Sequence, residues 1–160
     1  MHYAIEWTYA RYTERVRYDI DPFPTVILLA IDGSEEARIA SRMAAGIAEG
    51  TDSELHLVYV AGTGGGDPRA YAQMRQSSRT LLDEQAEQMR DAGAKMMKTH
   101  LRNGRPGQEI VALAEELGAG LIVMGGRGLG GMKRALMGSV SDSVIRHAHC
   151  PILVARATHT

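Results

Sequence analysis

The sequence is notable first for what it has little of. Its single cysteine, Cys150, excludes an internal disulfide and favours a reducing compartment. No apolar run approaches the roughly 20 residues that a membrane-spanning helix needs. The formal net charge of −1 gives no overall attraction to nucleic acid or to an acidic membrane surface. We therefore expect a cytoplasmic protein without a nucleic-acid or membrane partner.

Patterns typical of secretion, catalysis and metal binding are also missing. Charged residues such as Glu6 and Arg11 interrupt the N-terminal region, which argues against a secretory signal. No Ser-His-Asp or paired-carboxylate arrangement can be argued from spacing, so catalytic residues stay unknown. The spacing of His147, His149 and Cys150 is too tight for the usual zinc patterns. We expect no metal site there, with His147 at a helix C-terminus and Cys150 at the start of a buried strand.

The chain of 160 residues fits one domain, and its second part alternates strand-like and helix-like segments. This alternation predicts an α/β fold with a mostly parallel sheet. Strands are expected at residues 25–31, 55–60, 95–101, 121–124 and 151–155. Helices are expected after Asp32-Gly33-Ser34 as far as Gly50, and at residues 71–92, 107–117 and 139–147. In the first helix Ala40, Met43, Ala44 and Ile47 form the expected apolar stripe.

The order of the strands can be predicted from their composition. Residues 25–31 are continuously apolar, as in a strand buried on both faces, whereas residues 95–101 alternate only weakly and suit an edge. Right-handed crossovers with helices on both faces require one reversal, which predicts a doubly wound sheet in the order 3-2-1-4-5. Ligands of such sheets bind where the order reverses, here between Asp32 and Gly125.

A glycine-rich segment, residues 125–138, follows the fourth strand and is called the glycine loop below. Its glycines allow a sharp turn and a close approach to a ligand, and it leads into a helix beginning near Ser139. Free N–H groups at that helix start favour an anion. Arg127, Lys133 and Arg134 add positive charge. The loop therefore predicts a phosphate-binding site.

Several alternatives stay open for individual residues. Gly126, Gly128 and Gly131 match a dinucleotide fingerprint, but the helix begins too late and no acidic residue follows the next strand, which makes a nicotinamide oxidoreductase a poor candidate. Ser139, followed by Asp142, also matches a helix capping box. Asp32 could equally be a helix cap or a turn former.

The spacing of Gly125-x-x-Gly128, nine residues and Gly138-Ser139 resembles the nucleotide-binding signature of the universal stress protein family. The similarity extends over residues 24–156 and includes Asp32-Gly33-Ser34. The resemblance implies a UspA-like domain of the ATP-binding subgroup, with a five-stranded adenine nucleotide alpha hydrolase-like fold. It also implies a homodimer, for which pairing through the last strand, Ile152 to Val154, is expected.

The resemblance further implies a set of ligand-binding residues. Asp32 and Val60 would lie near adenine or ribose, Met124 and Gly125 along the nucleoside, and the helix start near the phosphates. The full set is Ala30, Asp32, Val60, Met124, Gly125, Arg127, Gly128, Gly138, Ser139, Val140 and Ser141. The implied ligand is ATP, with ADP or AMP as alternatives and Mg²⁺ or Mn²⁺ as an accompanying cation.

The leading hypothesis for function is an ATP-binding regulatory or sensor module of the stress response that acts on an unidentified protein partner. The alternatives are an enzyme that slowly hydrolyses ATP or transfers its phosphoryl group, with at most weak ATPase activity, and a homodimeric interaction module with a structural nucleotide. Enzymatic phosphoryl transfer would need a divalent metal, and Asp32 is the conspicuous acidic candidate near the loop.

Residues 1–23 are an extension that the resemblance does not explain. They contain six of the eight aromatic residues of the chain, and the composition changes at Pro22. Aromatic side chains gain much from burial, so we expect this segment to pack within or between subunits. The predicted organisation is therefore an N-terminal extension (1–23), a universal stress protein domain (24–156) and a C-terminal tail (157–160).

Overall fold

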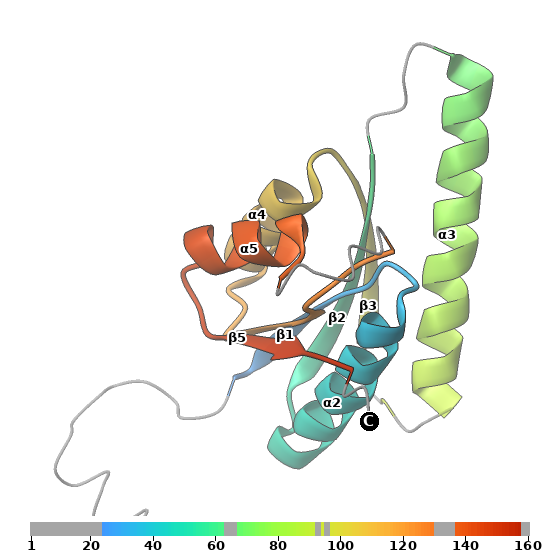
Figure 1. The fold of residues 1–160 in the computed structure, drawn as a ribbon. Helices are drawn as coiled ribbons and strands as arrows, with labels where there is room; N and C mark the ends of the chain where they lie inside the picture. The colour runs from blue at the N-terminus through green and yellow to red at the C-terminus, as the bar shows by residue number, and fades with distance from the viewer. Residues whose placement is uncertain (1–23, 63–66, 92–93, 95–96, 130–136, 158–160) are drawn as a thin grey trace, which may run out of the picture.

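The computed structural model describes residues 24–62, 67–91, 94, 97–129 and 137–157, in which strands and helices alternate (Figure 1). The strands are β1 (Val26–Ala30), β2 (Glu54–Ala61), β3 (Met97–Asn103), β4 (Leu121–Gly125) and β5 (Ile152–Ala155). The helices are α2 (Glu35–Thr51), α3 (Pro68–Asp91), α4 (Pro106–Leu117) and α5 (Ser139–His147). All the predicted elements are present, and only their ends differ by a few residues.

All five strands run parallel in one sheet with the order β3-β2-β1-β4-β5, which confirms the predicted topology. The chain builds outward from β1 to β3 and then returns to place β4 on the other side of β1. Strands β1 and β4 pair from Ile27 opposite Leu121 to Leu29 opposite Val123. The pairing ends at that register, and the carboxyl ends of both strands border a crevice.

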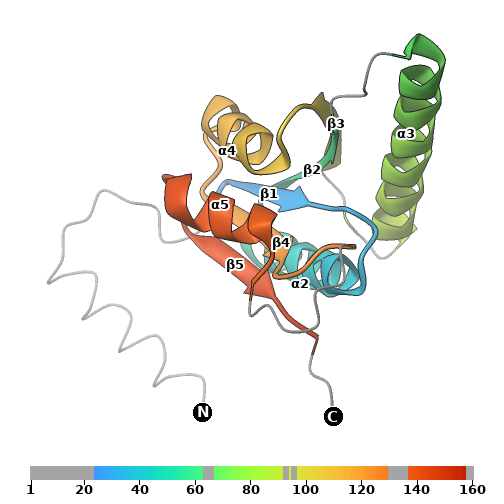
Figure 2. The same cartoon turned by 45° about the horizontal axis from the view of Figure 1, so that its top comes forward.

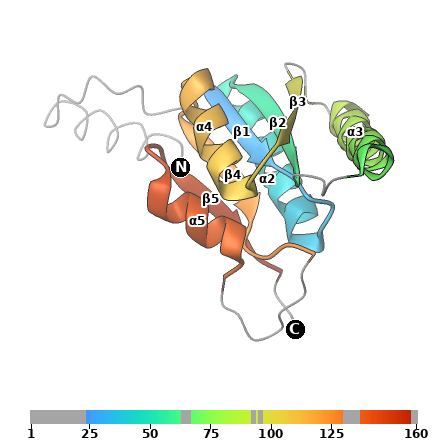
Figure 3. The same ribbon diagram turned by 90° about the horizontal axis from the view of Figure 1, so that it is seen from above.

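Helices cover both faces of the sheet, with α2 and α3 on one side and α4 and α5 on the other (Figures 2 and 3). Side chains of β1 alternate between the two cores: Ile27 and Leu29 pack toward α2 and α3, and Leu28 packs toward α4 and α5. All three are fully buried, as the continuous apolar run of this strand predicted. Each such side chain contributes roughly 1.5–3 kcal/mol through burial.

Helix α2 differs from its prediction in two respects. It runs through Gly50 and ends at Thr51, because Asp52 adopts the left-handed conformation (φ 56°) and its N–H bonds to Ala48 O. Met43 is 42% exposed, so its place in the apolar stripe was predicted wrongly. Small residues with Ala44 at their centre face the sheet instead, which lets the helix pack closely against β4.

The two edges of the sheet are β3 and β5. Strand β3 is only partly buried, as predicted for an edge. Strand β5 was expected to be buried, but Ile152, Leu153 and Val154 are half-buried and only Ala155 is buried. An edge strand has one neighbour, here β4, so its other side is covered less. Pairing of β5 in a homodimer stays a prediction.

Some predictions fall on residues that the structure does not describe: the extension 1–23, Gly131, Lys133, Arg134 and the end of the tail. In the described ranges no helix has both the length and the apolar composition to span a bilayer.

Candidate functional site

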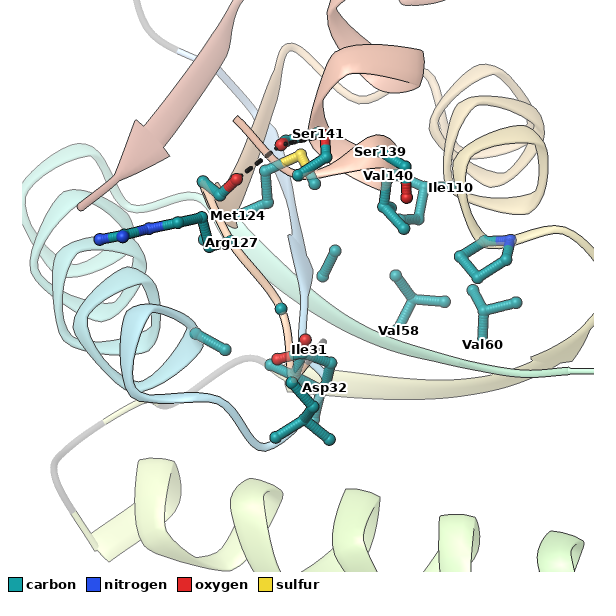
Figure 4. A pocket seen from close by; sticks show the side chains of 18 of the residues that line it. Ile31, Asp32, Val58, Val60, Ile110, Met124, Arg127, Ser139, Val140 and Ser141 are labelled. Atoms are coloured by element: carbon teal, nitrogen blue, oxygen red, sulfur yellow. Dashed lines mark hydrogen bonds between the residues drawn. The ribbon is translucent and has the colours of Figure 1, made fainter. Parts of the chain in front are cut away.

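A cavity of about 410 Å³ lies where the strand order reverses, at the carboxyl ends of β1 and β4 (Figure 4). Its walls come from β1, β2, β4, the N-terminal ends of three helices and the glycine loop. Every residue of the predicted set lines it: Ala30, Asp32, Val60, Met124, Gly125, Arg127, Gly128, Gly138, Ser139, Val140 and Ser141. Residues from distant parts of the sequence thus meet at the predicted crevice.

Four apolar side chains of one core cluster line the cavity and are called the apolar wall below: Val58, Val60, Ile110 and Met124. Val58 and Val60 alternate on the same face of β2, and Ile110 comes from the second turn of α4. Val58 and Ile110 were not predicted as site residues. The period of two along β2 was the signal that could have placed Val58 beside Val60. This wall suits the flat, weakly polar surface of an aromatic ring.

The described ends of the glycine loop, residues 125–129 and 137–138, also line the cavity, and a side chain there would meet other parts of the chain. A Cβ on Gly125 would lie 3.0 Å from the backbone of Glu36, and one on Gly128 would lie 2.6 Å from Asp32 Oδ2. The Gly138 N–H donates to Gly126 O at 2.7 Å, which closes the loop at its base. The glycines were predicted to leave room for a ligand, and the structure adds that they let the start of the loop pack against Asp32 and α2.

Asp32 is a turn former and not the cap of α2. Its Oδ1 accepts a hydrogen bond from Ser34 N at 2.9 Å, whereas the N-cap is Ser34, whose Oγ accepts from Ala37 N at 3.2 Å. The Ser34 hydroxyl also donates to Arg127 O at 3.3 Å, which ties this turn to the glycine loop. Asp32 Oδ2 is left facing Gly128.

The capping box predicted for Ser139 is wrong. Gly138 is the N-cap of α5, with extended backbone (φ −79°, ψ 157°), and Ser139 is the first helical residue. Asp142 pairs instead with Arg146 one turn later (2.9 Å). No side chain caps α5 in the part of the chain that the structure describes, so the N–H groups of its first turn are open to an anion.

Ser141 has a structural role that its predicted place near the phosphates did not include. Its hydroxyl is almost completely buried and lies 2.8 Å from Gly126 O and 2.9 Å from Gly138 O, to which it donates (Figure 4). The side chain therefore holds the two ends of the glycine loop together. Only the backbone N–H of Ser141 is left for a ligand.

Arg127 does not supply the positive charge that was expected in the cavity. Its guanidinium points away from the cavity (Figure 4) and donates to Glu36 Oε1 through Nε (2.9 Å) and Nη2 (2.6 Å). Burial alone would raise the pKa of Glu36, but hydrogen bonds from Arg127 and from the Ala157 N–H outweigh it and hold the pKa below its ordinary value. Glu36 was not predicted, because nothing in the sequence joins two residues 91 positions apart.

Among the described residues that line the cavity, Asp32 is the one carboxylate, and none is histidine, lysine or cysteine. The described residues contain no cluster of three or more metal-ligating side chains. His147 and His149 have separate partners: His147 Nδ1 lies 2.7 Å from Ser143 O, and His149 pairs with Glu115 at 3.1 Å. The geometry thus offers an anion site and an apolar wall, with few groups for acid-base chemistry.

The model of the universal stress protein family matches residues 25–156. The chain belongs to this family. A universal stress protein of Staphylococcus aureus strain USA300 is 39% identical over 81% of this chain and 82% of its own length. The family recognised from the sequence is confirmed, and the ATP-binding subgroup stays a prediction.

Solved structures of universal stress proteins share the fold. UspA from Lactobacillus plantarum superposes with a TM-score of 0.71 at 26% identity, covering 85% of this chain and all of its own. A universal stress protein in complex with cAMP (TM-score 0.66) and one from Archaeoglobus fulgidus in complex with dAMP (TM-score 0.63) are each 24% identical and cover 85% of this chain and 99% of their own. At that identity they show the common fold.

Proposed function

We propose that this universal stress protein binds an adenine nucleotide in the cavity, with the base on the apolar wall and the phosphates at the start of α5. The observation that carries the proposal is the N-terminus of α5, which no described side chain caps and which shares one cavity with an apolar wall. Such a pairing suits a ligand with an aromatic end and an anionic end. The cAMP and dAMP complexes of two family members support the choice of an adenine nucleotide.

In this proposal each predicted residue has a definite place. Ala30, Asp32 and Val60 lie near the base or ribose, and Met124 and Gly125 lie along the nucleoside. Gly128, Gly138, Ser139, Val140 and Ser141 hold the phosphates, mainly through backbone N–H groups, whereas the Arg127 side chain stays on Glu36. ATP is the form proposed, since three phosphates gain most from a helix N-terminus. Among the described lining residues Mg²⁺ or Mn²⁺ would find one carboxylate, Asp32, and would be held mainly by phosphate.

The output that we propose is regulatory: a cytoplasmic module whose nucleotide occupancy changes the surface offered to a partner, in a homodimer paired through β5. A carboxylate at Asp32 keeps slow hydrolysis as the second candidate. General-base chemistry needs a group aimed at the attacking water, and Asp32 Oδ1 is already occupied by Ser34 N. Binding without fast turnover is the simpler use of this site.

The sharpest test of binding adds one negative charge where the phosphates are placed. Ser139 is the exposed first residue of α5, so Ser139→Asp suits the helix dipole and leaves the fold intact. It should weaken ATP binding by about tenfold or more through charge repulsion. Gly138→Asp is less clean, because its Cβ would lie 3.2 Å from Gly126 O.

The matched control is Ser139→Asn, which has nearly the same shape without the charge. Isothermal titration calorimetry of both variants with ATP measures the difference. Equal ATP affinity of the two variants would show that the phosphates do not bind at this end of the cavity, and the proposal would be wrong.

Turnover is tested by phosphate release with Mg²⁺. For a binding module, we expect the purified wild-type chain to release no more phosphate than Ser139→Asp at the same concentration. Release above that level that is lost in Asp32→Asn, which keeps an oxygen for Ser34 N, would favour the slow hydrolase instead.

A further inference from the structure

Glu36 is a buried carboxylate that faces the back of the glycine loop and does not line the cavity. It lies in the first turn of α2 and is 4% exposed. A buried charge is costly unless it is paired and hydrogen-bonded, and this one uses both oxygens. The neighbouring Glu35 is exposed and shares the same helix end, so a favourable place in the helix dipole does not require burial.

The contacts of Glu36 connect three parts of the chain. Oε2 accepts from the backbone N–H of Arg127 at 2.6 Å. Oε1 accepts from the Arg127 side chain and, at 3.3 Å, from the N–H of Ala157 just after β5. One side chain therefore fixes the start of the glycine loop relative to α2 and to the sequence that follows the last strand.

The bond to the Arg127 N–H fixes the peptide group that joins Gly126 and Arg127. The carbonyl oxygen of that same peptide, Gly126 O, receives the Gly138 N–H at 2.7 Å and the Ser141 hydroxyl at 2.8 Å. The Gly126 N–H donates to Ala155 O at 2.9 Å. Gly138 is the N-cap residue of α5. Glu36 therefore binds the N–H of a peptide group whose carbonyl oxygen positions the N-terminus of that helix.

Charge alone predicts the opposite role for this residue. A carboxylate near an anion site repels the anion, and Glu36 also draws the Arg127 guanidinium away from the cavity. If electrostatics decided, removing the charge of Glu36 would tighten phosphate binding. If the hydrogen bonds between Glu36 and the loop decide, removing the charge of Glu36 would weaken phosphate binding. The sign of the effect separates the two.

We propose that Glu36 is a positioning residue for the phosphates of the bound ligand, acting through the backbone of Arg127 and Gly126. This inference rests on the proposed nucleotide binding. In metal sites, a residue that hydrogen-bonds to a ligand residue without touching the metal typically contributes about 10- to 100-fold to affinity. Here the supported groups are backbone N–H donors.

The test compares ATP with adenosine, which lacks the phosphates, by calorimetry on the full chain. We expect the wild-type chain to bind ATP more tightly than adenosine. Glu36→Gln should lose about tenfold in ATP affinity, in line with that range, and keep its adenosine affinity. Glu35→Gln removes the same charge one residue earlier and measures the purely electrostatic part, so it should leave ATP affinity unchanged or slightly higher.

Each other result has a definite meaning. An unchanged or tighter ATP affinity in Glu36→Gln overturns the positioning role, as does a wild-type chain that binds ATP and adenosine equally. A wild-type chain that binds neither overturns the proposed function itself.

If Glu36→Gln fails to fold, Arg127→Lys replaces it. Lysine keeps the positive charge but cannot donate through two fixed nitrogens, and the Arg127 side chain is 25% exposed, so the fold should tolerate the change. A positioning role predicts that this variant prefers ATP over adenosine less than the wild type does. An unchanged preference overturns it.

Discussion

The apolar wall and the glycine loop face each other across one cavity but are held in shape by different forces. The wall is part of the core between the sheet and the helices α4 and α5, so packing fixes it. The described ends of the loop are fixed by hydrogen bonds of its backbone with side chains: Ser34 and Ser141 donate to loop carbonyl groups, and Glu36 accepts from a loop N–H. Changes in the wall should therefore affect stability first, whereas changes at the loop should affect the anionic part of the ligand first.

The largest expected effect comes from Ile110→Ala in the apolar wall. Ile110 is 3% exposed, and its truncation should lower the free energy of unfolding by about 2–5 kcal/mol, as measured by urea denaturation. It should weaken adenosine and ATP binding to the same degree, because the proposed binding mode places the phosphates at the start of α5 and not on the wall. The ratio of the two affinities should stay as in the wild type.

Leu113→Ala is the matched control for this prediction. Leu113 lies on the same face of α4, is 1% exposed and does not line the cavity. It should lose comparable stability with unchanged adenosine affinity. A change in the ratio of ATP to adenosine affinity in Ile110→Ala would break the separation between the wall and the loop.

The same contrast explains what could be predicted from the sequence. Local patterns predict the strands and helices. Examples are the continuous apolar run of β1 and Gly118, which ends α4 in the left-handed conformation. Right-handed crossovers then leave few strand orders, and the order places Asp32 opposite Gly125. The location of the cavity followed from these local signals.

What the sequence could not reveal depends on contacts between distant residues. The direction of the Arg127 side chain is decided by Glu36, 91 positions away, and the burial of Glu36 is visible only once α2 packs behind the loop. The N-cap of α5 is Gly138, one residue before the Ser139 that the capping box suggested. Glycine and serine both suit an N-cap, and the closure of the loop decides between them. Met43 was misplaced because helical spacing does not define the width of the buried stripe.

The smallest expected effect is on the pH dependence of stability, and it tests the loop side of the comparison without any ligand. Glu36 has its pKa held below the ordinary value of 4.5 in the folded chain. Its ionised form thus stabilises the fold fully above about pH 5, and this contribution is lost as the pH falls through the lowered pKa. Glu36→Gln should denature with less dependence on pH than the wild type between about pH 5 and pH 3.

Glu54 and Asp142 also have lowered pKa values, through Lys98 and Arg146, but they contribute equally to each variant. The comparison of variants therefore isolates the contribution of Glu36. Glu35→Gln, one residue earlier, should follow the wild-type curve. Urea midpoints measured across this pH range give the two slopes. If the curves of wild type and Glu36→Gln ran parallel, Arg127 and Ala157 would not hold the carboxylate in solution, and the loop would depend on its other hydrogen bonds, such as those from Ser34 and Ser141.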